Sequence, residues 1–172
     1  MLDDIYNARI LEYAGNIPLL GRLAEPDGTA KAHSKLCGST VIVDLKLADG
    51  VVSEFGHDVK ACALGQASSS IMARNIIGAK PEELRQLRSA MVAMLKDNGP
   101  APEGRFAECR FLEPVRDYKA RHASTLLTFD AVVDALDEAE AKGRSAKADK
   151  QREVKAAALG ALNAAGIRYR VR

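Results

Sequence analysis

The chain has 172 residues, of which 47% are hydrophobic and 28% are charged, and both fractions are ordinary for a soluble globular protein. This length allows one domain with its own core plus an appendage. Trp is absent and aromatic residues make up only 5%, which argues against the aromatic platforms that stack single-stranded nucleic acid. No stretch approaches the roughly 20 apolar residues that span a bilayer, and no leader pattern opens the chain, so we expect a cytoplasmic protein without a membrane partner.

The net charge of +2 conceals an uneven distribution. Residues 142–172 contain nine Lys and Arg but two acidic residues, a net of +7, so residues 1–141 carry −5. This asymmetry predicts a domain over residues 1–142 and a basic C-terminal extension over residues 143–172. We expect the extension to be solvated or to dock onto a protein rather than to bind nucleic acid.

In chain order, an amphipathic helix is predicted over residues 3–14, and residues 17–36 are predicted to be mostly loop. A β-hairpin follows, because apolar and polar residues alternate over 41–47, and residues 51–59 are predicted to return as its second strand. Asp49-Gly50 lies between the two stretches and supplies the positive φ of a tight turn.

Helices are predicted for most of the remaining chain. The stretch that starts at Ala61 is rich in small residues and predicts a helix that packs closely on a neighbour. Pro81 is predicted to begin another helix, whose core face is Leu84, Leu87, Met91, Met94 and Leu95. The later predictions are a long helix over 119–141, a polar linker over 143–150, an Ala-rich helix over 155–165 and a short strand over 167–172. Together these elements predict an α+β fold, with a small antiparallel sheet packed against several helices.

The three cysteines, Cys37, Cys62 and Cys109, are too few and too scattered for a disulfide framework. Cys37 lies just before the first predicted hairpin strand and Cys62 just after the second, so the hairpin is expected to bring both thiols to one end of the sheet. His122 comes from the long downstream helix. Two thiolates and one imidazole suit zinc or iron.

Three segments resemble the IscU/SufU/NifU N-terminal family of iron–sulfur cluster assembly scaffolds over roughly residues 3–140. They are Leu36-Cys37-Gly38, then Cys62 with Ala67-Ser68-Ser69-Ser70 and Ala73, and finally Lys119-Ala120-Arg121-His122-Ala123-Ser124-Thr125-Leu126. The resemblance implies the SufE/NifU-like fold and a ligand set of Cys37, Cys62 and His122 for an iron–sulfur cluster, iron or zinc. It also implies a cysteine desulfurase and cluster-recipient proteins as partners.

Two positions depart from the family pattern. Ser39 stands where the family has an aspartate, and Ala123 stands where it has a third cysteine. A water, Cys109 or His57 would then have to supply a fourth ligand. The aromatic residues that flank Cys109 also favour a buried structural cysteine, and His57 is expected to be a surface or hydrogen-bonded histidine rather than a ligand.

Three functions remain open from the sequence. The leading hypothesis is a non-enzymatic scaffold that binds iron, a cluster or zinc through Cys37, Cys62 and His122. The second is a degenerate paralogue that acts as a protein-interaction or regulatory module, because two ligand positions are lost. The third is a SufU-like zinc protein that accepts sulfur from a desulfurase, with Cys109 or Cys62 in place of the cysteine missing at position 123.

Overall fold

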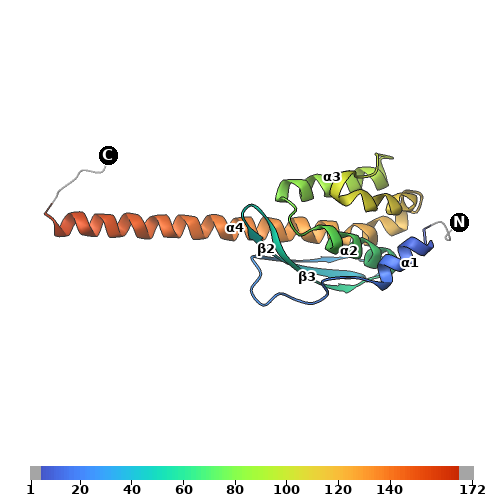
Figure 1. The fold of residues 1–172 in the computed structure, drawn as a ribbon, viewed down its shortest axis with the longest axis horizontal. Coiled ribbons are helices and arrows are strands. Elements are labelled where there is room, and N and C mark those ends of the chain that lie inside the picture. Colours follow the sequence, from blue (N-terminus) through green and yellow to red (C-terminus); the bar gives the residue numbers. More distant parts are fainter. Residues whose placement is uncertain (1–4, 167–172) are drawn as a thin grey trace. The chain divides into compact units, whose positions relative to one another are not determined.

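The structure of the protein is a computed structural model that describes residues 5–166. The chain divides into two compact units, residues 1–139 and 140–172. The elements are α1 (Ala8–Gly15), β1 (Gly28–His33), β2 (Thr40–Ala48), β3 (Val51–Lys60), α2 (Ala63–Asn75), α3 (Pro81–Lys96), the 3-10 segment η2 (Gly104–Asp117) and α4 (Lys119–Ala164). The predicted α+β class is confirmed: one antiparallel sheet in the order β1-β2-β3 packs against helices (Figure 1).

The predicted hairpin is confirmed as β2 and β3. Asp49 and Gly50 have φ angles of 53° and 77°, the pair of positive values that a two-residue hairpin turn requires. The register shifts between Lys46 and Leu47, close to the turn, and from Lys46 opposite Glu54 the two strands pair without interruption to Thr40 opposite Lys60. The chain therefore enters β2 and leaves β3 at the same end of the sheet.

Strand β1 corrects the prediction that residues 17–36 are mostly loop. Its sequence, Gly-Thr-Ala-Lys-Ala-His, has few β-branched or aromatic residues, so its own strand signal is weak. The strand forms because it pairs with β2 and fits against α4. A Cβ at Gly28 would lie 1.9 Å from the carbonyl oxygen of Ala135, so only glycine allows this approach.

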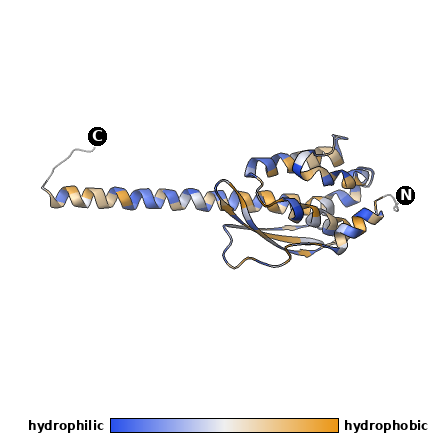
Figure 2. Cartoon of the chain, viewed as in Figure 1, coloured by the Kyte–Doolittle hydropathy of each residue, from blue (hydrophilic) through white to orange (hydrophobic). Residues whose placement is uncertain are grey.

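The core of residues 5–139 lies between the sheet and the helices. In Figure 1, α2 lies between the sheet and α3. In Figure 2 the hydrophobic residues of these helices lie mainly on their inner sides. The predicted core face of α3 is confirmed, since all five of its residues are buried. Ser68, Ser69 and Ser70 of α2 are also fully buried, as expected for a helix of small residues in close contact with its neighbours.

The first helix begins later than predicted. It starts at Ala8 rather than residue 3, because the Asn7 side chain accepts a hydrogen bond from the Ile10 amide at 3.0 Å and caps the helix there. Residues 3 and 4 lie outside the described part of the chain.

The segment η2 was not predicted, and Phe106, Cys109, Leu112 and Val115 anchor it in the core.

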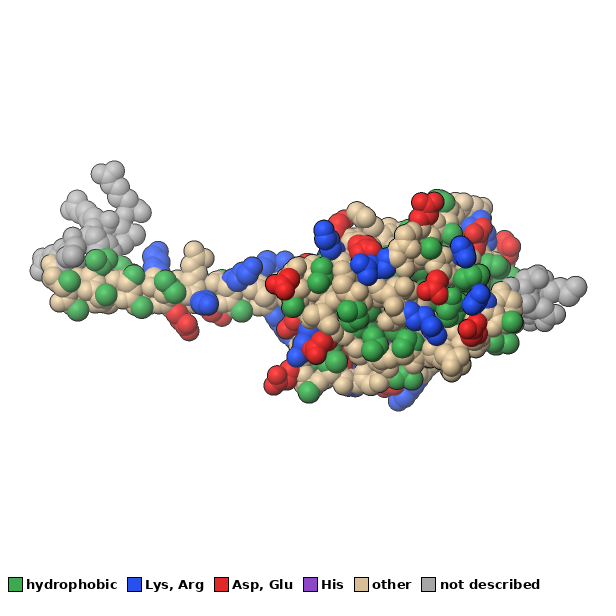
Figure 3. All heavy atoms as spheres, viewed as in Figure 1, with side chains coloured by type: hydrophobic (Ala, Val, Ile, Leu, Met, Phe, Trp, Pro, Cys, Tyr) green, Lys and Arg blue, Asp and Glu red, His purple; other side chains and the backbone are tan. Residues whose placement is uncertain are grey.

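The linker predicted over residues 143–150 is wrong, because these residues are helical. They are mostly Ala, Lys, Arg and Asp around Gly143, and good helix formers tolerate one glycine at a cost of about 1 kcal/mol. In Figure 3, Lys and Arg side chains gather along the earlier part of the extension and hydrophobic ones along its later part. The strand predicted over 167–172 lies outside the described residues. Within residues 5–166, no helix has the length and apolar content to cross a bilayer.

Candidate functional site

The hairpin brings the segments of Cys37 and Cys62 together at one end of the sheet. Ser39, just before β2, links them: its hydroxyl oxygen lies 3.0 Å from the Cys37 sulfur and accepts a hydrogen bond from the Cys62 amide at 3.3 Å. The Ser39 side chain therefore contacts both cysteine segments. The sequence had indicated position 39 only as a place where the family's aspartate is absent.

A short closed loop presents Cys37 to solvent. The Ser34 amide donates to the Ser39 carbonyl at 2.9 Å, and the Gly38 amide donates to the Ser34 carbonyl at 2.9 Å. Gly38 has a φ of 72°, which lets the chain turn back into β2. Cys37 is exposed at the tip of this loop, beside Leu36 with an exposed fraction of 78%.

Hydroxyl groups surround the Cys37 thiol. Burial by itself raises the pKa of Cys37, but hydrogen bonds from the side chains of Ser34, Ser39 and Ser124 and from the Ser39 backbone outweigh it, so the pKa falls to about 7. The Ser34 hydroxyl is buried, and no partner lies within the usual hydrogen-bond geometry among the described residues, so it is free to turn toward the thiolate. Neither Ser34 nor Ser124 was predicted to act on the Cys37 thiol, because serine in a loop or helix gives no signal of such a role.

Cys62 occupies the N-cap position of α2, as predicted from the change to helix-forming residues after it. Its carbonyl accepts the Gln66 amide at 2.9 Å, while its thiol makes no capping hydrogen bond. The half-buried Cys62 sulfur is thus not used to hold the helix end.

His122 is the fourth residue of α4 and is buried, with an exposed fraction of 7%. Its Nε2 lies 3.1 Å from the Val115 carbonyl oxygen and 3.0 Å from that of Arg116. Carbonyl oxygens only accept hydrogen bonds, so Nε2 carries a proton and Nδ1 is the nitrogen left for a metal. His122 lines a second pocket with Leu95, Asn98 and neighbouring residues rather than the pocket at Cys37.

The structure does not assemble the predicted ligands into one group. Across residues 5–166, no set of three or more His, Cys, Asp or Glu side chains is arranged to hold a metal ion. Ala123 is exposed and offers no donor. Cys109, considered as a substitute ligand, is fully buried in the core, and burial raises its pKa to about 12.

The two remaining histidines have other surroundings. His57 is fully buried, and its Nε2 lies 2.8 Å from the Pro18 carbonyl oxygen, which makes it a hydrogen-bonded interior residue. Burial lowers the pKa of His57. His33 is exposed, and its Nδ1 lies 3.1 Å from the Thr40 hydroxyl oxygen.

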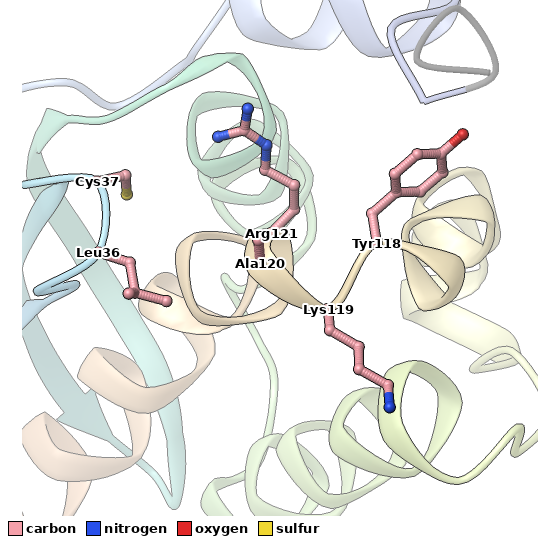
Figure 4. Close-up of a pocket in the computed structure, with 6 residues that line it drawn as sticks. All are labelled: Leu36, Cys37, Tyr118, Lys119, Ala120 and Arg121. Carbon is pink, nitrogen blue, oxygen red and sulfur yellow. The ribbon is translucent and has the colours of Figure 1, made fainter.

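A pocket of about 480 Å³ opens beside Cys37, between the Cys37 loop and the beginning of α4 (Figure 4). Its lining residues are Leu36, Cys37, Tyr118, Lys119, Ala120 and Arg121. Two of the six are basic and none is acidic. The exposed thiol therefore borders an electropositive space.

Helices α2 and α4 meet closely next to this site. A Cβ at Gly65 would lie 2.7 Å from the Ala61 side chain and 3.2 Å from the Ser124 carbonyl oxygen. Glycine at position 65 therefore sets how near Ser124, and with it the first turns of α4, can come to α2.

Comparison with known proteins gives one consistent result. The family model described as NifU-like N terminal domain matches residues 5–125. An iron–sulfur cluster assembly scaffold protein IscU from Thermotoga maritima is 27% identical over 132 residues, which cover 77% of this chain and 92% of the relative.

Solved structures agree with this match. The crystal structure of a nitrogen-fixing NifU-like protein (N-terminal) from Brucella abortus is 70% identical, has a TM-score of 0.80 and covers 82% of this chain and 98% of its own. A putative scaffold protein for the SUF system from Fervidobacterium islandicum shares the fold, with a TM-score of 0.72, 20% identity and coverage of 78% and 98%.

Proposed function

The chain belongs to the NifU-like N-terminal domain family of iron–sulfur cluster assembly scaffolds, and from this we propose that it binds iron or a nascent iron–sulfur cluster as cargo at Cys37 and Cys62. The observation that carries the proposal is the shared Ser39 hydroxyl, which holds the Cys37 sulfur and the Cys62 amide within one small group. Thiolate is the form that binds iron, and the hydroxyls around Cys37 favour it near neutral pH. In this role the protein is a non-enzymatic carrier.

His122 is the proposed third donor, through Nδ1, because Nε2 is engaged by the Val115 and Arg116 carbonyls. Those two hydrogen bonds fix the imidazole tautomer, as carbonyl partners do for metal-binding histidines. Since His122 does not group with the cysteines here, its use as a ligand requires the beginning of α4 to move toward them when cargo binds.

Anaerobic reconstitution with ferrous iron and sulfide tests the proposal. The wild-type protein should retain iron and sulfide after desalting, and Cys37→Ala and Cys62→Ala should each reduce retention at least tenfold. Cys109→Ala is the matched control, because it removes one thiol from the core and leaves the pair intact. Equal retention in all four proteins would contradict the proposal, and circular dichroism would check that each variant is folded. The same experiment with zinc in place of iron decides between the two metals.

A second candidate function is supported by the exposure of Cys37. Of the three cysteines it is the exposed one, so we propose it, rather than Cys109 or Cys62, as the thiol that would accept sulfur from a cysteine desulfurase. The Cys37 thiolate would attack the terminal sulfur of the donor persulfide, the S–S bond would break, and the donor cysteine would leave as a thiolate. Mass spectrometry after incubation with a desulfurase and its substrate cysteine should find one additional sulfur on Cys37, and an unmodified Cys37 would contradict this role.

A further inference from the structure

The site at Cys37 and Cys62 has too few donors for its proposed cargo. Iron in a cluster takes four ligands, and the described residues hold no group of three His, Cys, Asp or Glu. Ala123 follows the pocket residue Ala120 by three positions on α4, and residues at this spacing are neighbours on the helix surface. It is exposed and carries only a methyl group. Position 123, where the family pattern has a third cysteine, is thus open to solvent and offers no ligand.

The pocket of about 480 Å³ is lined by Cys37 and by Ala120, one helical turn before Ala123, and its volume is within the roughly 300–1,000 Å³ of small-molecule sites. Lys119 and Arg121 line it, and neither makes an ion pair with any residue in the range 5–166. Figure 4 shows their side chains extending in different directions from the beginning of α4, with Arg121 and Cys37 both bordering the space. A guanidinium and an ammonium with no carboxylate partner among the described residues suit a ligand with more than one carboxylate.

We propose that this pocket binds an anionic low-molecular-weight thiol, a small peptide thiol with free carboxylates, whose sulfur supplies the ligand that Ala123 lacks. Lys119 and Arg121 hold the carboxylates, and the thiol sulfur binds the iron held by Cys37 and Cys62. On binding, the thiol loses its proton to solvent and a solvent ligand leaves the iron, so no electrons are transferred. This inference rests on the proposed binding of iron or a cluster at the two cysteines.

The first test follows the thiol itself. Protein is reconstituted anaerobically with iron, sulfide and isotope-labelled glutathione, which carries two carboxylates, or with cysteamine, which carries an amine instead. We expect glutathione to remain with the loaded protein in proportion to its clusters after desalting, and cysteamine to be retained at least fivefold less. The double variant K119E/R121E should lose most of the retained glutathione.

The control is K150E/R152E, which changes the same two residue types at the same spacing in the exposed extension and should retain glutathione like the wild type. Equal retention by the two double variants would overturn the role of the pocket. Equal retention of glutathione and cysteamine would overturn the role of the carboxylates.

The second test restores the missing sulfur. In Ala123→Cys, iron and sulfide should be retained without added thiol, and the glutathione retained per cluster should fall at least threefold. If the wild type loads Cys37- and Cys62-dependent iron equally well with and without glutathione, and retains none, the inference fails while the proposed function stands. If iron loading needs a cysteine-bearing recipient protein rather than glutathione, a partner's cysteine fills the position and the inference is likewise overturned. If no protein, including Ala123→Cys, retains iron, both proposals fail.

Discussion

Cys37 and Cys109 carry the same side chain in opposite surroundings, one exposed at the end of the sheet and one buried in the core. At the end of the sheet, hydroxyls of Ser34, Ser39 and Ser124 outweigh the effect of burial and lower the pKa of Cys37 to about 7. In the core, nothing opposes burial, and the pKa of Cys109 rises to about 12. The chemistry of a thiol in this fold is thus set by whether small polar side chains surround it, so a count of cysteines says little about a metal site.

The largest expected effect is on thiol reactivity. With iodoacetamide near pH 7, Cys37 should be alkylated at least about 10³-fold faster than Cys109, because the thiolate is the nucleophile and the interior both suppresses and shields it. Peptide mass spectrometry over a time course measures both rates in the same sample. Comparable alkylation rates at Cys37 and Cys109 would contradict the proposed difference between the two thiols.

Replacing the thiol with a hydroxyl should lower stability more at Cys109 than at Cys37. Cys109→Ser should lower the free energy of unfolding by about 1–3 kcal/mol, because a buried hydroxyl replaces a fully buried thiol among apolar neighbours. Cys37→Ser, at an exposed position, should change it by less than about 0.5 kcal/mol. Urea unfolding followed by circular dichroism measures both, and a larger loss at Cys37 would contradict this assignment.

Ser39→Ala should change the reactivity of Cys37 and leave that of Cys109 unchanged. Without the Ser39 hydroxyl, the Cys37 thiolate loses a hydrogen bond, so the pKa of Cys37 should rise and its alkylation near pH 7 should slow several-fold. Ser39→Thr keeps the hydroxyl and serves as the control. The pH dependence of alkylation gives the pKa directly, and an unchanged curve in Ser39→Ala would argue against the hydroxyl as a cause.

The smallest effect is expected at His57, in the buried interior. Burial lowers its pKa in the folded state, so below about pH 6.5 the unfolded chain binds a proton more readily than the folded one. The contribution of neutral His57 to stability is therefore complete above that pH and is lost as the pH falls. Unfolding free energies between about pH 7.5 and 5.5 should decrease, and this slope should flatten in His57→Asn but not in His33→Gln, at an exposed histidine.

Local patterns in the sequence predicted the elements that carry their own signals. The alternation of residues around Asp49-Gly50 predicted the hairpin, and Pro81 predicted the beginning of α3. Strand β1 was missed because its pairing with β2 and its contact with α4 lie far away in the sequence. The continuous helix through Gly143 was missed because one glycine and several charges resemble a linker, although the residues around them favour a helix.

The candidate site was predictable only in part. The hairpin ends indicated that Cys37 and Cys62 lie close, and the structure places their segments on either side of Ser39. The hydroxyls of Ser34 and Ser124 come from a loop and a helix that no spacing rule connects. The position of His122, with its Nε2 on two carbonyls, depends on how η2 ends next to α4, and η2 itself has no periodic pattern.

The glycine at position 65 gives the thiol chemistry a dependence on distant packing. Any side chain there would collide with Ala61 and press on the Ser124 carbonyl, so α4 would have to shift away from α2. Ser124 would then change its position relative to Cys37, and the pKa of a surface thiol would change although the substitution touches neither cysteine. A substitution in this one interior contact would therefore tune sulfur reactivity while both Cys37 and Cys62 are kept.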